Sequence, residues 1–238
     1  MVILTGFYNA ENYIERCIAS IMSQTHKDFT CYITHDLSTD NSVKLVKEFI
    51  KNDSRFILLD DSDKKLYQTG NFDKVIRNNP NIDDNEVLIE VDGDDHLPDS
   101  NVFKRINELY KDENVWIANG SFRYSNGQNG FSEKQTGFGN LRGSRFTASH
   151  IRTWRAFLWR KIKEEDIRDE NGEYWQWSGD LCFMFPMLEM SGEEHYRFMS
   201  DVNYVYNAEN PINEHKVDMS MVNAHATKIR NKKPYKKL

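Results

Sequence analysis

The segment Glu86-Val-Leu-Ile-Glu-Val-Asp-Gly-Asp-Asp-His-Leu-Pro98 joins an apolar run to three carboxylates that lie within four residues. Its apolar part, 87–91, is typical of a strand that is buried on both faces of a sheet. Gly93 permits a tight turn, so the aspartates around it come close together. The segment therefore predicts a buried strand that ends in an acidic loop, formed by Asp92, Asp94 and Asp95.

Crowded carboxylates repel one another unless a cation or hydrogen-bond donors lie between them. Mg²⁺ or Mn²⁺ would meet this need, because both ions take oxygen ligands and leave coordination positions for phosphate oxygens. The alternative interpretation is a solvated acidic turn without an ion. A calcium loop is excluded, since Phe103 stands where a twelve-residue loop that begins at Asp92 needs its closing glutamate.

Strand-like and helix-like segments alternate along the first half of the chain. The alternation predicts right-handed crossovers and a mainly parallel sheet whose strands end along one edge. Ligands of such sheets bind at that edge, so residues that follow the strands should line one crevice. The expected strands cover 1–7, 29–34, 55–59, 87–91, 115–124 and 202–206.

The second half of the chain carries weaker signals. Residues 125–145 are rich in Gly, Asn, Ser and Gln, a composition that indicates a mobile loop beside the site. A helix is expected over 154–162, with its apolar residues on one face, and another helix is expected after Ser178.

The composition excludes several classes of protein. A net charge of −6 argues against general nucleic-acid binding. The three cysteines are far apart and odd in number, which indicates reduced core residues and no disulfide or zinc framework. No stretch has the roughly 18 consecutive apolar residues of a membrane helix, and no signal peptide is recognisable. We therefore expect a cytoplasmic protein with at most peripheral membrane contact through its basic C-terminal tail, 228–237.

Four short motifs follow one another in the first 110 residues. They read Phe7-Tyr-Asn9, Ser20-Ile-Met-Ser-Gln-Thr25, Asp36-Leu-Ser-Thr-Asp40 and Asp92-Gly-Asp94. In this order and spacing they resemble the signature of the family 2 glycosyltransferases, which have the GT-A fold. The chain departs from that pattern in having Gly6-Phe7 where proline is common and His35-Asp36 where two aspartates are common. The Gln-x-x-Arg-Trp motif of processive synthases is absent, so the resemblance is to the non-processive type.

The resemblance implies a metal site and a nucleotide pocket. Asp94 would bind Mn²⁺ or Mg²⁺ directly, Asp92 would meet the ribose or the metal, and Asp95 would support the donor sugar or the ion. His215 is a candidate for a further metal ligand. Asp36 would accept a hydrogen bond from the base, with helix capping as the alternative interpretation. The remaining residues expected to bind the nucleotide or donor are Thr5, Tyr8, Asn9, Glu11, Asn71 and Gly93.

An inverting transfer also needs a base that deprotonates the acceptor hydroxyl. Ser178-Gly-Asp180 resembles the family motif that places this carboxylate at the start of a helix. Trp177, with Tyr174 and Trp175, would supply apolar walls. In the alternative interpretation Asp180 only caps the helix and the tryptophans belong to a core. His150 and Arg152 are candidates for contact with the diphosphate or the acceptor, or are ordinary residues of a helix start.

These observations predict an α/β protein with the GT-A fold, a Rossmann-like, mainly parallel sheet flanked by helices with a smaller C-terminal acceptor-side region. Residues 1–124 are expected to bind the nucleotide-sugar, and 125–238 to form the acceptor side and tail of the same catalytic domain. The expected reaction is metal-dependent, inverting transfer of a hexose or N-acetylhexosamine from a nucleotide-diphosphate donor, with UDP favoured, to a hydroxyl of a glycan, lipid-linked or protein acceptor.

Two other functions stay open. One is a non-catalytic module that binds a sugar-nucleotide or glycan. The other is a nucleotidyltransferase on a related fold, which would need a glycine-rich basic loop after the first strand to hold a triphosphate. Residues 8–11 are not of that kind.

Overall fold

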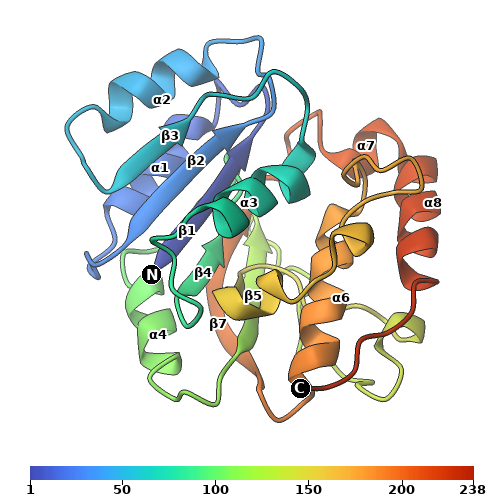
Figure 1. Ribbon diagram of the computed structural model, residues 1–238. Helices are drawn as coiled ribbons and strands as arrows, with labels where there is room; N and C mark the ends of the chain where they lie inside the picture. Colours follow the sequence, from blue (N-terminus) through green and yellow to red (C-terminus); the bar gives the residue numbers. More distant parts are fainter.

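The computed structural model describes residues 1–238 and contains one seven-stranded sheet with helices on both faces (Figure 1). The strands lie in the order β3-β2-β1-β4-β6-β5-β7. This arrangement confirms the predicted α/β architecture. The strands are β1 (Val2–Phe7), β2 (Thr30–His35), β3 (Phe56–Leu59), β4 (Val87–Glu90), β5 (Ile117–Tyr124), β6 (Arg152–Arg155) and β7 (Tyr196–Tyr206).

The helices alternate with the strands in the first half of the chain and gather in the second half. In Figure 1, α3 lies in front of the sheet, α6 lies to the right of β5 and α8 lies at the side of α6. No helix is both long enough and apolar enough to cross a membrane. The helices are α1 (Ile14–Met22), α2 (Ser42–Ile50), α3 (Tyr67–Asn78), α4 (Val102–Leu109), α5 (Ala156–Arg160), α6 (Gly179–Ser191), α7 (Glu214–Val217) and α8 (Met219–Arg230), with 3₁₀ turns at Leu141–Gly143 and Glu164–Asp166.

The pairing of the strands decides which residues share the functional edge of the sheet. β1 pairs in parallel with β2 and β4, and β2 pairs in parallel with β3. β6 runs antiparallel between β4 and β5, with Ile89 opposite Thr153. The amino end of β6 therefore lies at the edge where β1, β2 and β4 end. β5 and β7 are parallel to each other and also end at this edge.

Each face of the sheet carries its own core. On one face, Leu4, Leu88 and Trp154 pack with residues of α3, α5 and α6. On the other, Ile3 and Ile89 pack with residues of α1, α2 and α4. Burial of each such side chain contributes about 1.5–3 kcal/mol. Because both faces are covered, β4 is apolar almost throughout, as the sequence predicts for this strand.

The prediction of a single helix over 154–162 is wrong. Residues 152–155 form β6, and only 156–160 are helical. The β-branched Ile151 and Thr153 beside Trp154 favour a strand, and pairing with β4 and β5 satisfies their backbone groups. Tertiary pairing therefore overrides the helical spacing of the apolar residues. The last strand is also longer than predicted, because its exposed residues Ser200 and Asp201 interrupt the apolar pattern.

The segment 125–145, predicted as a loop, contains no strand or α-helix. Three buried polar side chains anchor it to the rest of the protein. Ser132 donates to the Gly120 carbonyl over 2.6 Å, and the Gln135 side-chain oxygen accepts from the Thr147 N–H over 2.8 Å. Arg142 forms a buried ion pair of 2.6 Å with Glu189 on α6. The loop therefore packs along the sheet through specific polar contacts.

Candidate active site

Three predicted groups of residues meet at the edge where β1, β2 and β4 end. Tyr8 and Asn9 follow β1, Asp36 follows β2, and Asp92 follows β4. The parallel pairing of these strands brings the groups together, as the alternating pattern predicts. Arg152 joins them because it begins the antiparallel strand β6.

Side-chain hydrogen bonds hold the loops of the proposed nucleoside pocket together. The Asp36 carboxylate accepts from the backbone N–H groups of Leu66 and Tyr67, over 2.7 and 2.9 Å. It thereby fixes the loop that enters α3. The loops after β1 and β2 are joined because Asn9 accepts from the Thr39 N–H, over 2.8 Å.

Tyr8 is the most accessible aromatic residue of this part of the site. Its side chain is 38% exposed, and the Lys65 Nζ lies 4.0 Å from the centre of its ring. Glu11 is exposed less and accepts from the Asn41 N–H over 3.0 Å. An accessible aromatic ring beside a cation can stack on a nucleobase and lie near phosphate.

Two of the predicted residues lie beneath the surface of the site. Thr5 is fully buried in β1, and its hydroxyl contacts the Cys31 sulfur. Asn71 is 5% exposed and donates to the Tyr67 carbonyl over 2.8 Å. Both residues therefore support the pocket from within the fold. Gly93 has no room for a side chain: a Cβ at this position would lie 2.6 Å from the Cβ of Phe7, closer than real atoms approach.

The acidic loop is held by donors from the end of β7 and from the segment that follows it. The Asp95 carboxylate is buried and accepts from the Tyr204 hydroxyl over 2.7 Å and from the Asn207 N–H over 2.6 Å. The Asp94 carboxylate accepts from the Asn210 side-chain amide over 2.7 Å. Burial raises the pKa of Asp94 and Asp95, and the neighbouring carboxylates raise that of Asp95 further. Ionised carboxylates at this loop therefore gain from a nearby cation.

One group of side chains has the chemistry and spacing of a metal site. The potential ligand atoms of Asp92, Asp95 and His150 all lie within 4.8 Å of one another. The Nδ1 atom of His150 is buried without a hydrogen-bond partner, and its ring stacks on Tyr204 with 4.5 Å between centroids. Burial lowers the pKa of His150, which favours the neutral imidazole that binds metals. Two carboxylates and an imidazole fit Mn²⁺, so these residues suit a divalent ion.

The histidine of this group differs from the one considered at the C-terminal end. His215 lies on the short helix α7 with an exposed side chain and is not part of the group. Asp94 is not part of it either, and its carboxylate accepts a hydrogen bond from the Asn210 side-chain amide. Sequence reasoning missed Tyr204, Asn207 and Asn210. The expected strand 202–206 and the polar residues after it were the available signal, but neither forms a motif.

Asp180 lies in the first turn of α6, as predicted. Ser178, just before the helix, has a left-handed backbone with φ of 55°. The Asp180 carboxylate is 27% exposed and accepts from the Arg152 guanidinium over 2.7 Å. Of the aromatic residues before it, Trp177 is half-buried, whereas Trp175 is 2% exposed and belongs to the core. Trp175 therefore belongs to the core, as in the alternative interpretation, whereas Trp177 is not part of the core.

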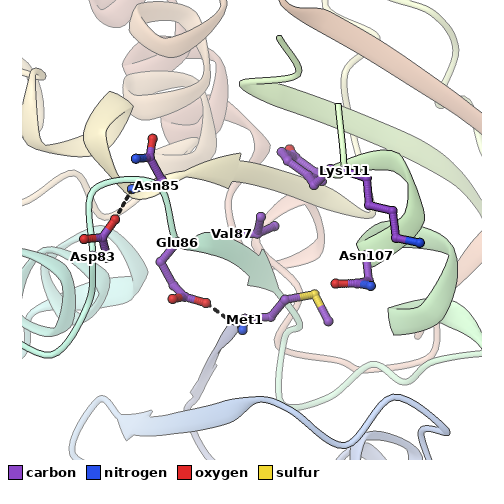
Figure 2. Close-up of a pocket in the computed structure, with 8 residues that line it drawn as sticks. Met1, Asp83, Asn85, Glu86, Val87, Asn107 and Lys111 are labelled. Carbon is purple, nitrogen blue, oxygen red and sulfur yellow. Dashed lines mark hydrogen bonds and ion pairs between the residues drawn. The ribbon is translucent and has the colours of Figure 1, made fainter. Parts of the chain in front are cut away.

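A surface pocket of about 420 Å³ lies at the opposite edge of the sheet (Figure 2). Figure 2 shows Met1, Glu86 and Val87 in this pocket, where β1 and β4 begin. Lys111 and Asn107 point toward it from the region of α4. None of the predicted site residues lines the pocket. The predicted site residues, at the ends of the strands, therefore lie apart from this pocket, which is at the beginnings of β1 and β4.

Comparison with known proteins assigns the family. Residues 2–168 match the protein family described as Glycosyl transferase family 2. Teichoic acid poly(glycerol phosphate) polymerase of Staphylococcus epidermidis is 45% identical over 65 residues, which are 26% of this chain and 9% of that protein. Glycosyltransferase GlyA of Streptococcus pneumoniae is 33% identical over 66 residues, which are 28% of this chain and 10% of GlyA. The chain thus matches only a small part of these relatives.

Solved structures support the fold. S. aureus TarS aligns with a TM-score of 0.67 and 16% identity, over 88% of this chain and 37% of its own. TarS 1-349 in complex with UDP-GlcNAc aligns with a TM-score of 0.66 and 16% identity, over 90% of this chain and 60% of that one. Mannosyltransferase PcManGT from Pyrobaculum calidifontis, in complex with GDP-Man and Mn²⁺, aligns with a TM-score of 0.59 and 12% identity. The alignment covers 98% of this chain and 65% of the mannosyltransferase chain. The protein described here has the GT-A fold and belongs to glycosyl transferase family 2.

Proposed function

We propose that the protein transfers a sugar from a nucleoside diphosphate donor to a hydroxyl acceptor, with inversion at the anomeric carbon. One observation carries the proposal: a partly exposed carboxylate, Asp180, lies at the same sheet edge as the acidic loop after β4 and the loops after β1 and β2. On this proposal the edge would hold a base, a cation-binding loop and a nucleoside pocket together. A binding module would have no need of the base.

The donor part of the site is proposed to lie over 1–124. Tyr8 would stack on the base, and Asp36 would accept from it, while Asn9 and Glu11 keep the surrounding loops in place. We propose uracil as the base. UDP and UDP-GlcNAc are bound by TarS, which has the same fold, whereas GDP-Man is bound by the more distant mannosyltransferase.

The acidic loop is proposed to hold Mn²⁺ or Mg²⁺ against the donor diphosphate. Asp94 and Asp92 would be direct ligands, with Asp95 and His150 as the buried part of the site. His215 stays a candidate for a further ligand from the C-terminal side. A divalent ion bound there supplies Lewis-acid stabilisation of the negative charge on the leaving diphosphate.

Asp180 is proposed as the general base. The acceptor oxygen forms a bond to the anomeric carbon while the bond from that carbon to the diphosphate oxygen breaks. The acceptor proton passes to the Asp180 carboxylate, and the nucleoside diphosphate leaves with the bonding electrons. Residues 125–238 would form the acceptor side, with Trp177 as an apolar wall, and the acceptor would be a hydroxyl of a glycan, a lipid-linked saccharide or a protein.

The experiment is to incubate the protein with Mn²⁺ and UDP-N-acetylglucosamine, with water as the acceptor, and to measure the UDP released. Asp180→Asn should bind UDP as well as the wild type does and release UDP at least about a hundredfold more slowly, since general-base catalysis contributes roughly 10²–10⁴-fold. Activity of this variant close to that of the wild type would remove Asp180 from the mechanism.

A further inference from the structure

A fully buried glutamate ends the central strand of the sheet. Glu90 has no exposed surface, and the other residues of the strand are apolar. Its Oε1 atom accepts from the Arg152 Nη1 over 2.8 Å. The pairing of β4 with β6 explains this contact, because Ile89 lies opposite Thr153 and the next pair outward is Glu90 and Arg152. The sheet register therefore places the two charges side by side.

The same guanidinium reaches the proposed base. Arg152 donates from Nη2 to the Asp180 carboxylate over 2.7 Å, while its own side chain is only 5% exposed. A planar guanidinium holds two carboxylates in fixed directions at once, whereas the donors of an ammonium group rotate on a flexible stem and fix no such directions. Arg152, which precedes Asp180 by 28 residues in the chain, consequently holds Asp180 at a defined position relative to the end of β4.

The network also reaches the acidic loop. The Gln68 side-chain amide on α3 donates to Glu90 over 3.0 Å and to Asp92 over 2.6 Å. An unbroken series of hydrogen bonds thus runs from Asp92 through Gln68, Glu90 and Arg152 to Asp180. It connects the residues proposed to hold the diphosphate with the residue proposed to accept the proton.

Stability alone does not account for these buried charges. Removing ions from water is costly, and well-packed apolar residues of similar volume are often at least as stabilising as a buried ion pair. The neighbouring strand positions are filled by apolar residues such as Leu88 and Trp154. A charged pair at this position is therefore better explained by what it orients.

We propose that Arg152 is a positioning residue for the Asp180 base, and that Glu90 holds and neutralises Arg152 so that it can take this position. The proposal rests on the proposed function of Asp180. It assigns Arg152 no contact with the donor, because Nη1 and Nη2 donate to Glu90 and Asp180 and the remaining Nε is buried without a partner. Loss of the Arg152 fork should slow the chemical step and leave donor binding unchanged.

The test uses Arg152→Lys and measures the release of UDP from UDP-N-acetylglucosamine with water as the acceptor. The lysine keeps the charge but lacks the planar fork that holds both carboxylates in fixed directions. We expect kcat to fall by about a hundredfold, as is usual for a misplaced catalytic group, with the donor KM and the Kd of UDP unchanged. A raised donor KM with unchanged kcat would overturn the proposal, because Arg152 would then bind the donor.

A double-mutant cycle tests whether Arg152 acts through Asp180. In the Asp180→Asn background, Arg152→Lys should cause little further loss of kcat, because the residue that it positions has already been removed. Losses that multiply in the double variant would overturn the proposal. If Arg152→Lys does not fold, Glu90→Gln serves in its place, since the glutamine keeps the shape and an acceptor oxygen. The same fall in kcat with unchanged KM is expected, because Glu90→Gln removes the charge that neutralises Arg152.

The chain offers a matched control on the same helix. Arg142 and Glu189, near the other end of α6, form an ion pair of 2.6 Å whose side chains are 5% and 6% exposed. Arg142→Lys should lower the melting temperature but leave kcat and KM unchanged. If it lowers kcat as much as Arg152→Lys, the effect reflects general loosening of α6 and the proposal is overturned.

Failure of the proposed function would be recognised separately. If the wild-type protein releases no UDP, or if Asp180→Asn is fully active, the proposed function fails. The same cycle is then measured by urea unfolding: additive losses of stability from Arg152→Lys and Asp180→Asn would show that the two side chains are not coupled. Normal activity of Arg152→Lys, with an inactive Asp180→Asn, overturns only the positioning role.

Discussion

The side-chain amide of Asn210 donates to the carboxylate of Asp94 over 2.7 Å and so ties the segment after β7 to the acidic loop after β4. The neighbouring Asn207 N–H does the same for Asp95, over 2.6 Å. Farther along this segment, Glu214 accepts from the Ser178 N–H over 3.0 Å, just before α6. Residues 207–214 therefore span the site from the acidic loop to the proposed base.

Asn210→Ala should weaken this connection. The free energy of unfolding should fall by about 1–2 kcal/mol, because a hydrogen bond to a carboxylate is lost from a partly buried position. Thermal denaturation in the presence of a chelator measures the effect. Addition of Mn²⁺ should still raise the melting temperature of the variant, since the Asp94 carboxylate remains. An unchanged stability would contradict the role given to Asn210.

Gly93→Ala should destabilise the turn between the aspartates. A Cβ at this position would lie 2.6 Å from the Cβ of Phe7 and 3.1 Å from the Gly6 carbonyl oxygen, so β1 and the loop must move apart. The expected loss is about 1–3 kcal/mol, as for other overpacked sites. Gly139→Ala is the control, because nothing lies within 4 Å of a Cβ built there. Equal stabilities of the two variants in urea unfolding would refute the argument.

Tyr8→Ala should weaken nucleotide binding. Stacking of a base on an aromatic side chain is worth about 1–3 kcal/mol, so the Kd of UDP should rise roughly tenfold or more. Tyr8→Phe keeps the ring and should bind UDP like the wild type. Isothermal titration calorimetry distinguishes the variants. If Tyr8→Phe were as weak as Tyr8→Ala, the hydroxyl and not the stacked ring would carry the interaction.

Asp60→Asn should change the stability of the protein in a pH-dependent way. Asp60 directly follows β3 and contacts His35 at the end of β2. Hydrogen bonds from Lys47 and then His35 hold the pKa of the Asp60 carboxyl below its usual range. The folded state thus binds fewer protons than the unfolded state, and the stabilisation is present above the unfolded pKa and lost as pH falls through the folded pKa. The variant should be less stable than the wild type at pH 7, by no more than a few tenths of a kcal/mol since Asp60 is 36% exposed. Melting temperatures that differ equally at pH 7 and pH 3 would contradict the assignment.

The first half of the fold could be predicted because its pattern is local. Each strand through β4 is a short apolar run followed by a segment with apolar residues at helical spacing, and the predicted bounds of β1 to β4 agree with the structure to within one residue. The parallel pairing then follows from general topology. β6 could not be predicted in this way, since Trp154 and its neighbours become a strand only by pairing between β4 and β5.

The site could be predicted in part. Asp36 and Asp92 follow strands, so their neighbourhood at one sheet edge is expected from topology, whereas Asp180 is expected only from the resemblance of Ser178-Gly-Asp180 to the family motif. The contacts that complete the site join residues far apart in sequence: Tyr204 reaches Asp95 across 109 positions, and Arg152 reaches Glu90 across 62. Neither Tyr204 nor Arg152 belongs to a motif, and such pairs appear only when the sheet register is known.

The most direct measurement is thermal melting of the purified protein with a panel of nucleoside diphosphates, with and without Mn²⁺. At a hundredfold excess over its dissociation constant, a ligand of the native state stabilises it by about 2.7 kcal/mol. Metal-dependent donor binding predicts a Mn²⁺-dependent rise in melting temperature with UDP, which Asp94→Asn abolishes. No shift with any nucleoside diphosphate, or a shift with UDP that persists in Asp94→Asn without Mn²⁺, would contradict metal-dependent donor binding at this sheet edge.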